Sequence, residues 1–101
     1  MRRSLAGHGA ALIATALMWA LTACAGAPVQ EMSDARQAIS AARAAGAAET
    51  APEPLAQATE LLASAEQALQ RHDYPTARRQ AEKARAQAVT ALNLASKAAQ
   101  P

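Results

Sequence analysis

The sequence predicts an all-α protein, a small bundle of about three helices in which the second and third form an antiparallel hairpin. Alanine, the strongest helix former, dominates the chain after residue 24. Large apolar side chains are few in this part, which has no Phe and no Trp, because the single Trp of the chain is Trp19. Apolar residues recur at steps of three and four, which is the spacing of one helix face. The predicted core is thin, so we expect a domain that is only marginally stable alone.

The first helix is predicted over residues 29–45. Met32, Ala35, Ile39 and Ala42 fall on one face of such a helix. Gly46 is typical of the position that follows a helix end, and residues 46–51 are expected to form a linker.

The second helix is predicted to begin with a capping box, in which the Thr50 side chain accepts a hydrogen bond from the Glu53 amide. Pro52 and Pro54 are tolerated there because amides of the first turn have no partner within the helix. The helix is then expected to continue to about residue 71 along one apolar stripe, formed by Leu55, Ala58, Leu62, Ala65 and Leu69.

The hairpin corner is predicted at residues 72–75. Asp73 suits the N-cap of the third helix, and Pro75 falls in its first turn. Tyr74 is interpreted as the aromatic that packs at this corner rather than as a ligand contact, and His72 as an exposed turn residue. The apolar stripe of the third helix begins at Tyr74 and continues as a seam of alanines that lets helix backbones approach closely: Ala77, Ala81, Ala84, Ala88, Ala91, Ala95 and Ala98.

The charges of the last two helices have opposite signs. The second helix is acidic and the third is basic, so antiparallel packing would place opposite charges side by side and specify the register. Each exposed pair would contribute only about 0–1 kcal/mol. The alternative is that these charges simply solvate the outer faces of the two helices.

A lipobox-type motif precedes the helices, namely Leu21, Thr22, Ala23 and Cys24. It follows Arg2, Arg3 and an uncharged stretch, in the order of a secretory signal. As a helix that stretch would span only about 20 Å of a roughly 30 Å hydrocarbon core. We therefore predict a lipoprotein signal peptide at residues 1–23, a lipidated Cys24 with a short flexible tether at residues 24–28, and an Ala-rich helical domain at residues 29–100.

Two other interpretations of this segment stay open. The A-x-A patterns at residues 23–25 and 25–27 would release a soluble periplasmic protein. An uncleaved signal-anchor would leave Cys24 as an unmodified small residue.

Composition argues against several classes of function. The net charge of +2 arises from Arg2 and Arg3, so the chain after residue 23 is formally neutral and no nucleic-acid partner is expected. The same part has one histidine, His72, and no Gly-rich phosphate loop. We therefore expect neither enzymatic activity nor a metal or other cofactor.

Three segments resemble the domain of unknown function 4398 family: residues 32–39 (MSDARQAI), 51–55 (APEPL) and 73–78 (DYPTAR). The resemblance covers nearly the whole chain after the tether. It implies a small Ala-rich lipoprotein of a Gram-negative bacterium, and Ala25 after the cysteine looks like the outer-membrane sorting pattern. Some relatives carry a peptidoglycan-binding domain for which this chain has no room. The chain also lacks a C-terminal lysine, so no covalent link to peptidoglycan is expected.

The expected function is therefore that of a non-enzymatic, lipid-anchored envelope protein. Its helical domain would face the periplasm from the outer membrane as an interaction or structural module, through self-association or an envelope protein partner. The alternative is a soluble periplasmic protein with a binding or chaperone-like role.

Overall fold

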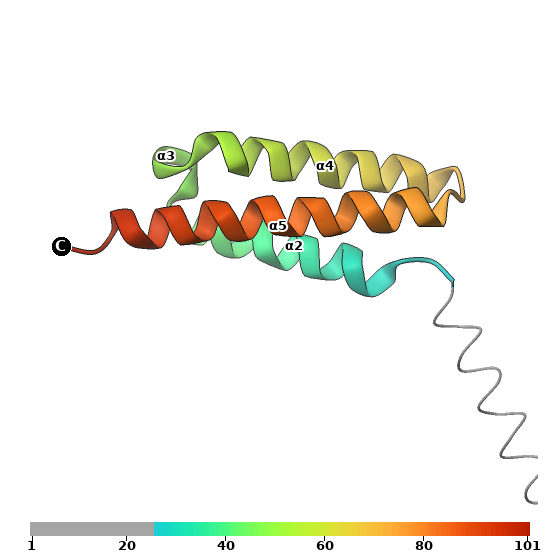
Figure 1. Ribbon diagram of the computed structural model, residues 1–101, viewed down its shortest axis with the longest axis horizontal. Helices are drawn as coiled ribbons and strands as arrows, with labels where there is room; N and C mark the ends of the chain where they lie inside the picture. Colours follow the sequence, from blue (N-terminus) through green and yellow to red (C-terminus); the bar gives the residue numbers. More distant parts are fainter. Residues whose placement is uncertain (1–25) are drawn as a thin grey trace, which may run out of the picture.

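The computed structural model describes residues 26–101, and this part of the chain folds into four helices without a strand (Figure 1). The helices are α2 (Val29–Ala44), α3 (Ala47–Thr50), α4 (Pro52–Gln70) and α5 (Tyr74–Ala98). The three long helices confirm the predicted all-α bundle. Among residues 26–101, no helix combines the length and the apolar character needed to cross a membrane.

The three long helices lie side by side, and each runs in the opposite direction to the long helix before it in the chain. Figure 1 shows α4 and α5 as an antiparallel hairpin, as predicted, with α2 beside α5 and running the same way. Helix α5 contacts α2, α3 and α4, and α2 also contacts α4. This topology brings the start of α2 to the end of the bundle where the corner between α4 and α5 lies.

The core is built almost entirely of alanine. Helix α5 buries alanines at alternating steps of four and three, the heptad spacing that gives a coiled-coil seam. These residues are Ala77, Ala81, Ala84, Ala88, Ala91 and Ala95. Apart from Met32, Ile39 and Leu55, all buried hydrophobic residues of the bundle are alanines.

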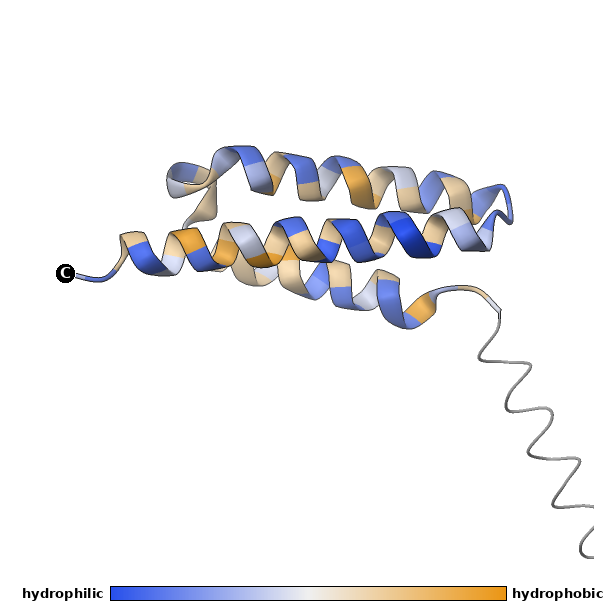
Figure 2. Cartoon of the chain, viewed as in Figure 1, coloured by the Kyte–Doolittle hydropathy of each residue, from blue (hydrophilic) through white to orange (hydrophobic). Residues whose placement is uncertain are grey.

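The predicted faces of the other long helices are largely confirmed. All four expected residues of α2 are buried. Helix α4 buries Leu55, Ala58 and Ala65 of the predicted stripe, together with Ala68. Hydrophilic residues cover much of the visible side of α4 and α5, while hydrophobic ones gather in the C-terminal half of α5 (Figure 2).

The connection between α2 and α4 differs from the prediction. Gly46 ends α2 with a left-handed φ of 88°, as its position suggested. The next four residues form the short helix α3 rather than a linker without helix. Ala47 and Ala51 are both buried, and this turn covers the end of the core. Burial of these two side chains favours the helical turn.

The predicted capping box is wrong. The N-cap of α4 is Ala51, and no side chain caps this end. Thr50 belongs to α3, where its hydroxyl donates to the Gly46 carbonyl at 3.0 Å. The first amide of α4 to donate to Ala51 is that of Leu55, at 3.3 Å. Pro52 and Pro54 both lie before it, which is why the helix tolerates two prolines.

The expected charge pairing between α4 and α5 is also absent from the described residues. Their two ion pairs join α2 to its neighbours: Arg36 to Glu66 of α4 at 3.4 Å, and Glu31 to Arg78 of α5 at 3.2 Å. Alanines fill the contact between α4 and α5, so the longer charged side chains lie outside it. This arrangement agrees with the alternative interpretation, in which the charges solvate outer faces.

Two substitutions in α5 test the close packing of the alanine seam. Ala88 is fully buried, and Ala86 is exposed on the same helix. Ala88→Leu should lower the free energy of unfolding by about 1–3 kcal/mol, because extra methylenes must displace a neighbouring helix. Ala86→Leu should change it by less than about 0.5 kcal/mol. Urea unfolding followed by circular dichroism measures both, and equal effects would contradict a close-packed seam.

Candidate functional site

The predicted lipobox and Cys24 lie outside the described residues, so their roles stay predictions. The described chain begins at Gly26, two residues after Cys24. Its segment 26–28 meets the bundle beside the first turns of α5. This end of the molecule therefore contains both the start of the described chain and the predicted corner residues.

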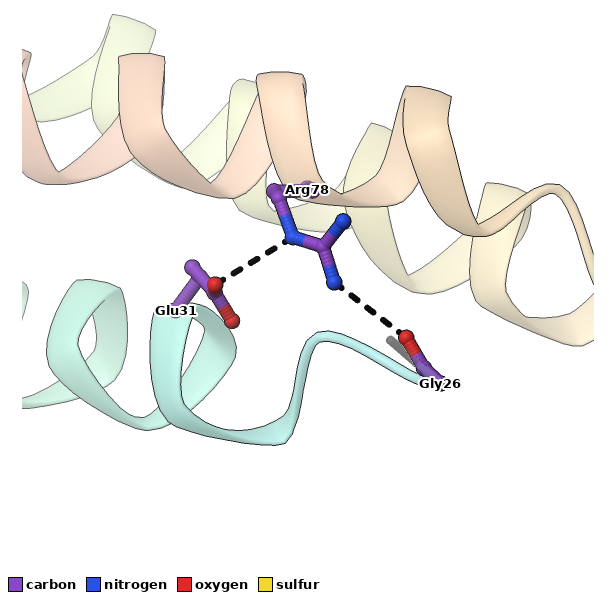
Figure 3. Close-up of polar contacts among 3 residues, drawn as sticks. All are labelled: Gly26, Glu31 and Arg78. Atoms are coloured by element: carbon purple, nitrogen blue, oxygen red, sulfur yellow. Dashed lines mark hydrogen bonds and ion pairs between the residues drawn. The ribbon is translucent and has the colours of Figure 1, made fainter. Parts of the chain in front are cut away.

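Arg78 joins the start of the described chain to the bundle. Its Nε donates to Glu31 Oε1 at 3.2 Å, and its Nη2 donates to the Gly26 carbonyl at 3.2 Å (Figure 3). The Arg78 and Glu31 side chains are 33% and 31% exposed. Partial burial and ionised partners make such hydrogen bonds stronger than ordinary surface contacts. We call this set of three residues the Arg78 clamp.

The residues between Gly26 and α2 are packed as well. Pro28 is among the most deeply buried side chains of residues 26–101. Its carbonyl accepts from the Met32 amide at 3.0 Å, and the Ala27 carbonyl accepts from the Val29 amide at 2.9 Å. Residues 26–28, expected to be part of a flexible tether, are thus held against the bundle. The side chains on either side of Pro28 are exposed: Ala27 lies at the surface, and 73% of the surface of Val29 is exposed.

The corner residues occupy the positions that the sequence predicted. Asp73 is the N-cap of α5, and its side chain accepts from the Thr76 amide at 3.4 Å. Pro75 lies in the first turn. Tyr74 is half-buried, and its hydroxyl lies 3.2 Å from Nδ1 of the exposed His72. The two rings meet edge to face with centroids 6.0 Å apart, which is a packing geometry.

The turn before α5 has the geometry of a Schellman motif. The His72 amide donates to Leu69 at 3.0 Å and the Asp73 amide to Ala68 at 2.9 Å. This motif requires a left-handed residue at its centre, and His72 has a φ of 60°. Histidine therefore occupies a position where glycine is favoured.

The polar contacts of the described residues lie mainly at the surface. No group of three or more His, Cys, Asp or Glu residues among them could hold a metal ion. Their buried set contains no polar or charged side chain. A surface groove runs between α2 and α5, lined by Glu31, Asp34, Glu82, Arg85, Ala86 and Val89.

Sequence reasoning missed the Arg78 clamp. Arg78 and Gly26 are 52 positions apart, and no local pattern marks a contact over that distance. In the sequence, Arg78 is only one of several basic residues of the third helix. The signal that could have found it is topological: α2 must run parallel to α5 before residues 26 and 78 can meet.

The fold and this end together define an alanine-packed bundle of three long helices in which residues 26–28 are held beside α5. The family model of the domain of unknown function DUF4398 matches residues 30–100. The match covers well over half of the chain, so the protein belongs to this family, as the sequence motifs predicted. A comparison with curated proteins gave no match, and neither did a comparison with solved structures.

A glycine substitution tests the strain at His72. His72→Gly should raise the free energy of unfolding by about 0.5–1 kcal/mol, because glycine adopts positive φ without a steric cost. Arg71, the preceding residue, has a φ of −83°, so Arg71→Gly should destabilise the protein or leave it unchanged. Thermal unfolding by circular dichroism compares the two variants. Equal destabilisation would show that the left-handed turn is not strained.

The Arg78 clamp can be tested against its neighbour in the sequence. Arg78→Gln should lower the free energy of unfolding by about 1 kcal/mol, because Glu31 and the Gly26 carbonyl both lose a charged donor. Arg79 is exposed, and its one hydrogen-bond acceptor among the described residues is Thr76, within its own helix turn. Arg79→Gln should therefore have little effect in the same urea titration, and equal effects would contradict the clamp.

Proposed function

We propose that this protein is a lipoprotein of the bacterial envelope, held in a membrane by lipid on Cys24. The motif Leu21, Thr22, Ala23 and Cys24 carries the proposal, because it ends a signal-like segment and contains the only cysteine of the chain. Lipoprotein processing would remove residues 1–23. Two or three acyl chains on Cys24 would make the attachment effectively permanent.

The helical domain is proposed to act without catalysis, as a structural or interaction module that faces the periplasm from the outer membrane. Two observations support this role: the described residues bury no polar side chain, and the alanine stripes are used within the bundle. Self-association would therefore use apolar surface outside the core, such as Val89 and Leu94 of α5, which are 37% and 44% exposed. Outer-membrane sorting is proposed because Ala25 follows Cys24.

Radiolabelled palmitate tests the anchor in a Gram-negative host. The wild-type chain should incorporate label and sediment with membranes, whereas Cys24→Ser should incorporate none, because the thioether cannot form. Density-gradient separation of the two membranes then tests the outer-membrane assignment. An unlabelled wild-type chain in the soluble periplasmic fraction would overturn the proposal and favour the soluble alternative.

A further inference from the structure

The position of the Arg78 clamp constrains how an anchored chain would meet its membrane. Gly26 is two residues after Cys24, and two extended residues span at most about 7 Å. Because Gly26 and Pro28 are held against the bundle, little free chain separates the domain from a lipidated cysteine. The end of the bundle that contains Gly26 would therefore lie at the lipid headgroups.

The side chains at this end suit a phospholipid surface. Val29 is the most exposed large apolar residue of the described chain, at 73%. Arg71 and Arg79 are exposed nearby, at the end of α4 and in the first turns of α5. Of the acidic groups nearest this end, Glu31 binds Arg78, Asp73 caps α5 and Asp34 accepts from Gln30. Glu82 is exposed one turn further along α5, away from this end. Exposed arginines beside a lipid anchor attract anionic headgroups.

We propose that the end of the bundle containing Gly26, Val29 and the turn between α4 and α5 docks on an anionic phospholipid surface. The bundle then stands on the membrane, with α3 and the C-terminal end of α5 directed away from it. Helix α5 has 25 residues, so its far end would lie about 37 Å from the docked end. This inference rests on the proposed lipidation of Cys24.

Two matched probes test the orientation in the full, lipidated protein. Gln70→Cys places a thiol at the docked end and Gln100→Cys places one at the far end; both glutamines are exposed. Because Cys24 would be alkylated by lipid, the new thiol alone would react with a fluorophore. The proteins are then reconstituted in vesicles of phosphatidylethanolamine and phosphatidylglycerol that contain a headgroup-bound, short-range quencher.

The fluorescence of the probe at residue 70 should be quenched strongly. The fluorescence of the probe at residue 100 should stay close to its intensity in vesicles without quencher. Equal quenching at both positions would show a bundle that lies flat, and absence of quenching at both would show a domain held away from the surface. Either result overturns the docking. Mass spectrometry of the same samples reads the acyl groups on Cys24. A chain without them overturns the proposed function and the docking together, whereas a lipidated chain with equal quenching overturns the docking alone.

Charge reversal tests the lipid chemistry. Arg79→Glu should reduce quenching of the probe at residue 70 in anionic vesicles but not in vesicles of phosphatidylcholine alone. Lys97→Glu makes the same change of charge near the far end of α5 and should leave that quenching unchanged. Circular dichroism confirms that both variants stay helical. Equal loss in the two variants would show that only the net charge matters, which contradicts docking through this end.

Discussion

The close approach of α5 to its neighbours is the constraint on which the rest of the structure depends. Every buried residue of this helix is an alanine, and it contacts all the other described helices. A methyl side chain removes little apolar area from water, so stability must come from many short contacts between helix surfaces. Such packing depends on side-chain volume, because a well-packed interior has few voids to accept an added group. The two ion pairs of the described residues lie at the edges of this packing and join α2 to α4 and to α5.

How much of the fold the sequence predicts depends on the range of the interactions. The three long helices, most of their buried faces, the Gly46 stop and the Asp73 cap depend on residues within about one or two turns, and local spacing predicted them. It failed for Leu62 and Leu69, which are only partly buried, and for Ala98, which is exposed. Thr50 shows the limit of this reasoning. Its motif fits an N-cap, but burial of Ala47 and Ala51 favours a helical turn that includes Thr50 as its last residue. A buried environment thus overrode a local signal.

The candidate site lies beyond that limit for a different reason. The corner residues belong to one turn, so Asp73 and Pro75 were placed correctly from their spacing. The Arg78 clamp requires the third dimension, because its members come from the start of α2 and from α5. Opposite charges on two helices did not predict their partners either. The acidic partner of Arg78 is Glu31 of α2 rather than a residue of α4.

The same topology separates the two ends of the bundle. An odd number of long helices places the start of the first and the end of the last at opposite ends, as Figure 1 shows. A lipid on Cys24 would therefore hold the molecule at one end only. The sides of α4 and α5, with their hydrophilic residues (Figure 2), would remain in water and open to other molecules. The core uses most of the alanines of these helices, while Ala56, Ala63, Ala86 and Ala98 are exposed. A partner would therefore meet charged side chains, scattered methyl groups and a few larger apolar side chains such as Leu94. Recognition on such a surface depends on complementary charge and shape more than on apolar burial.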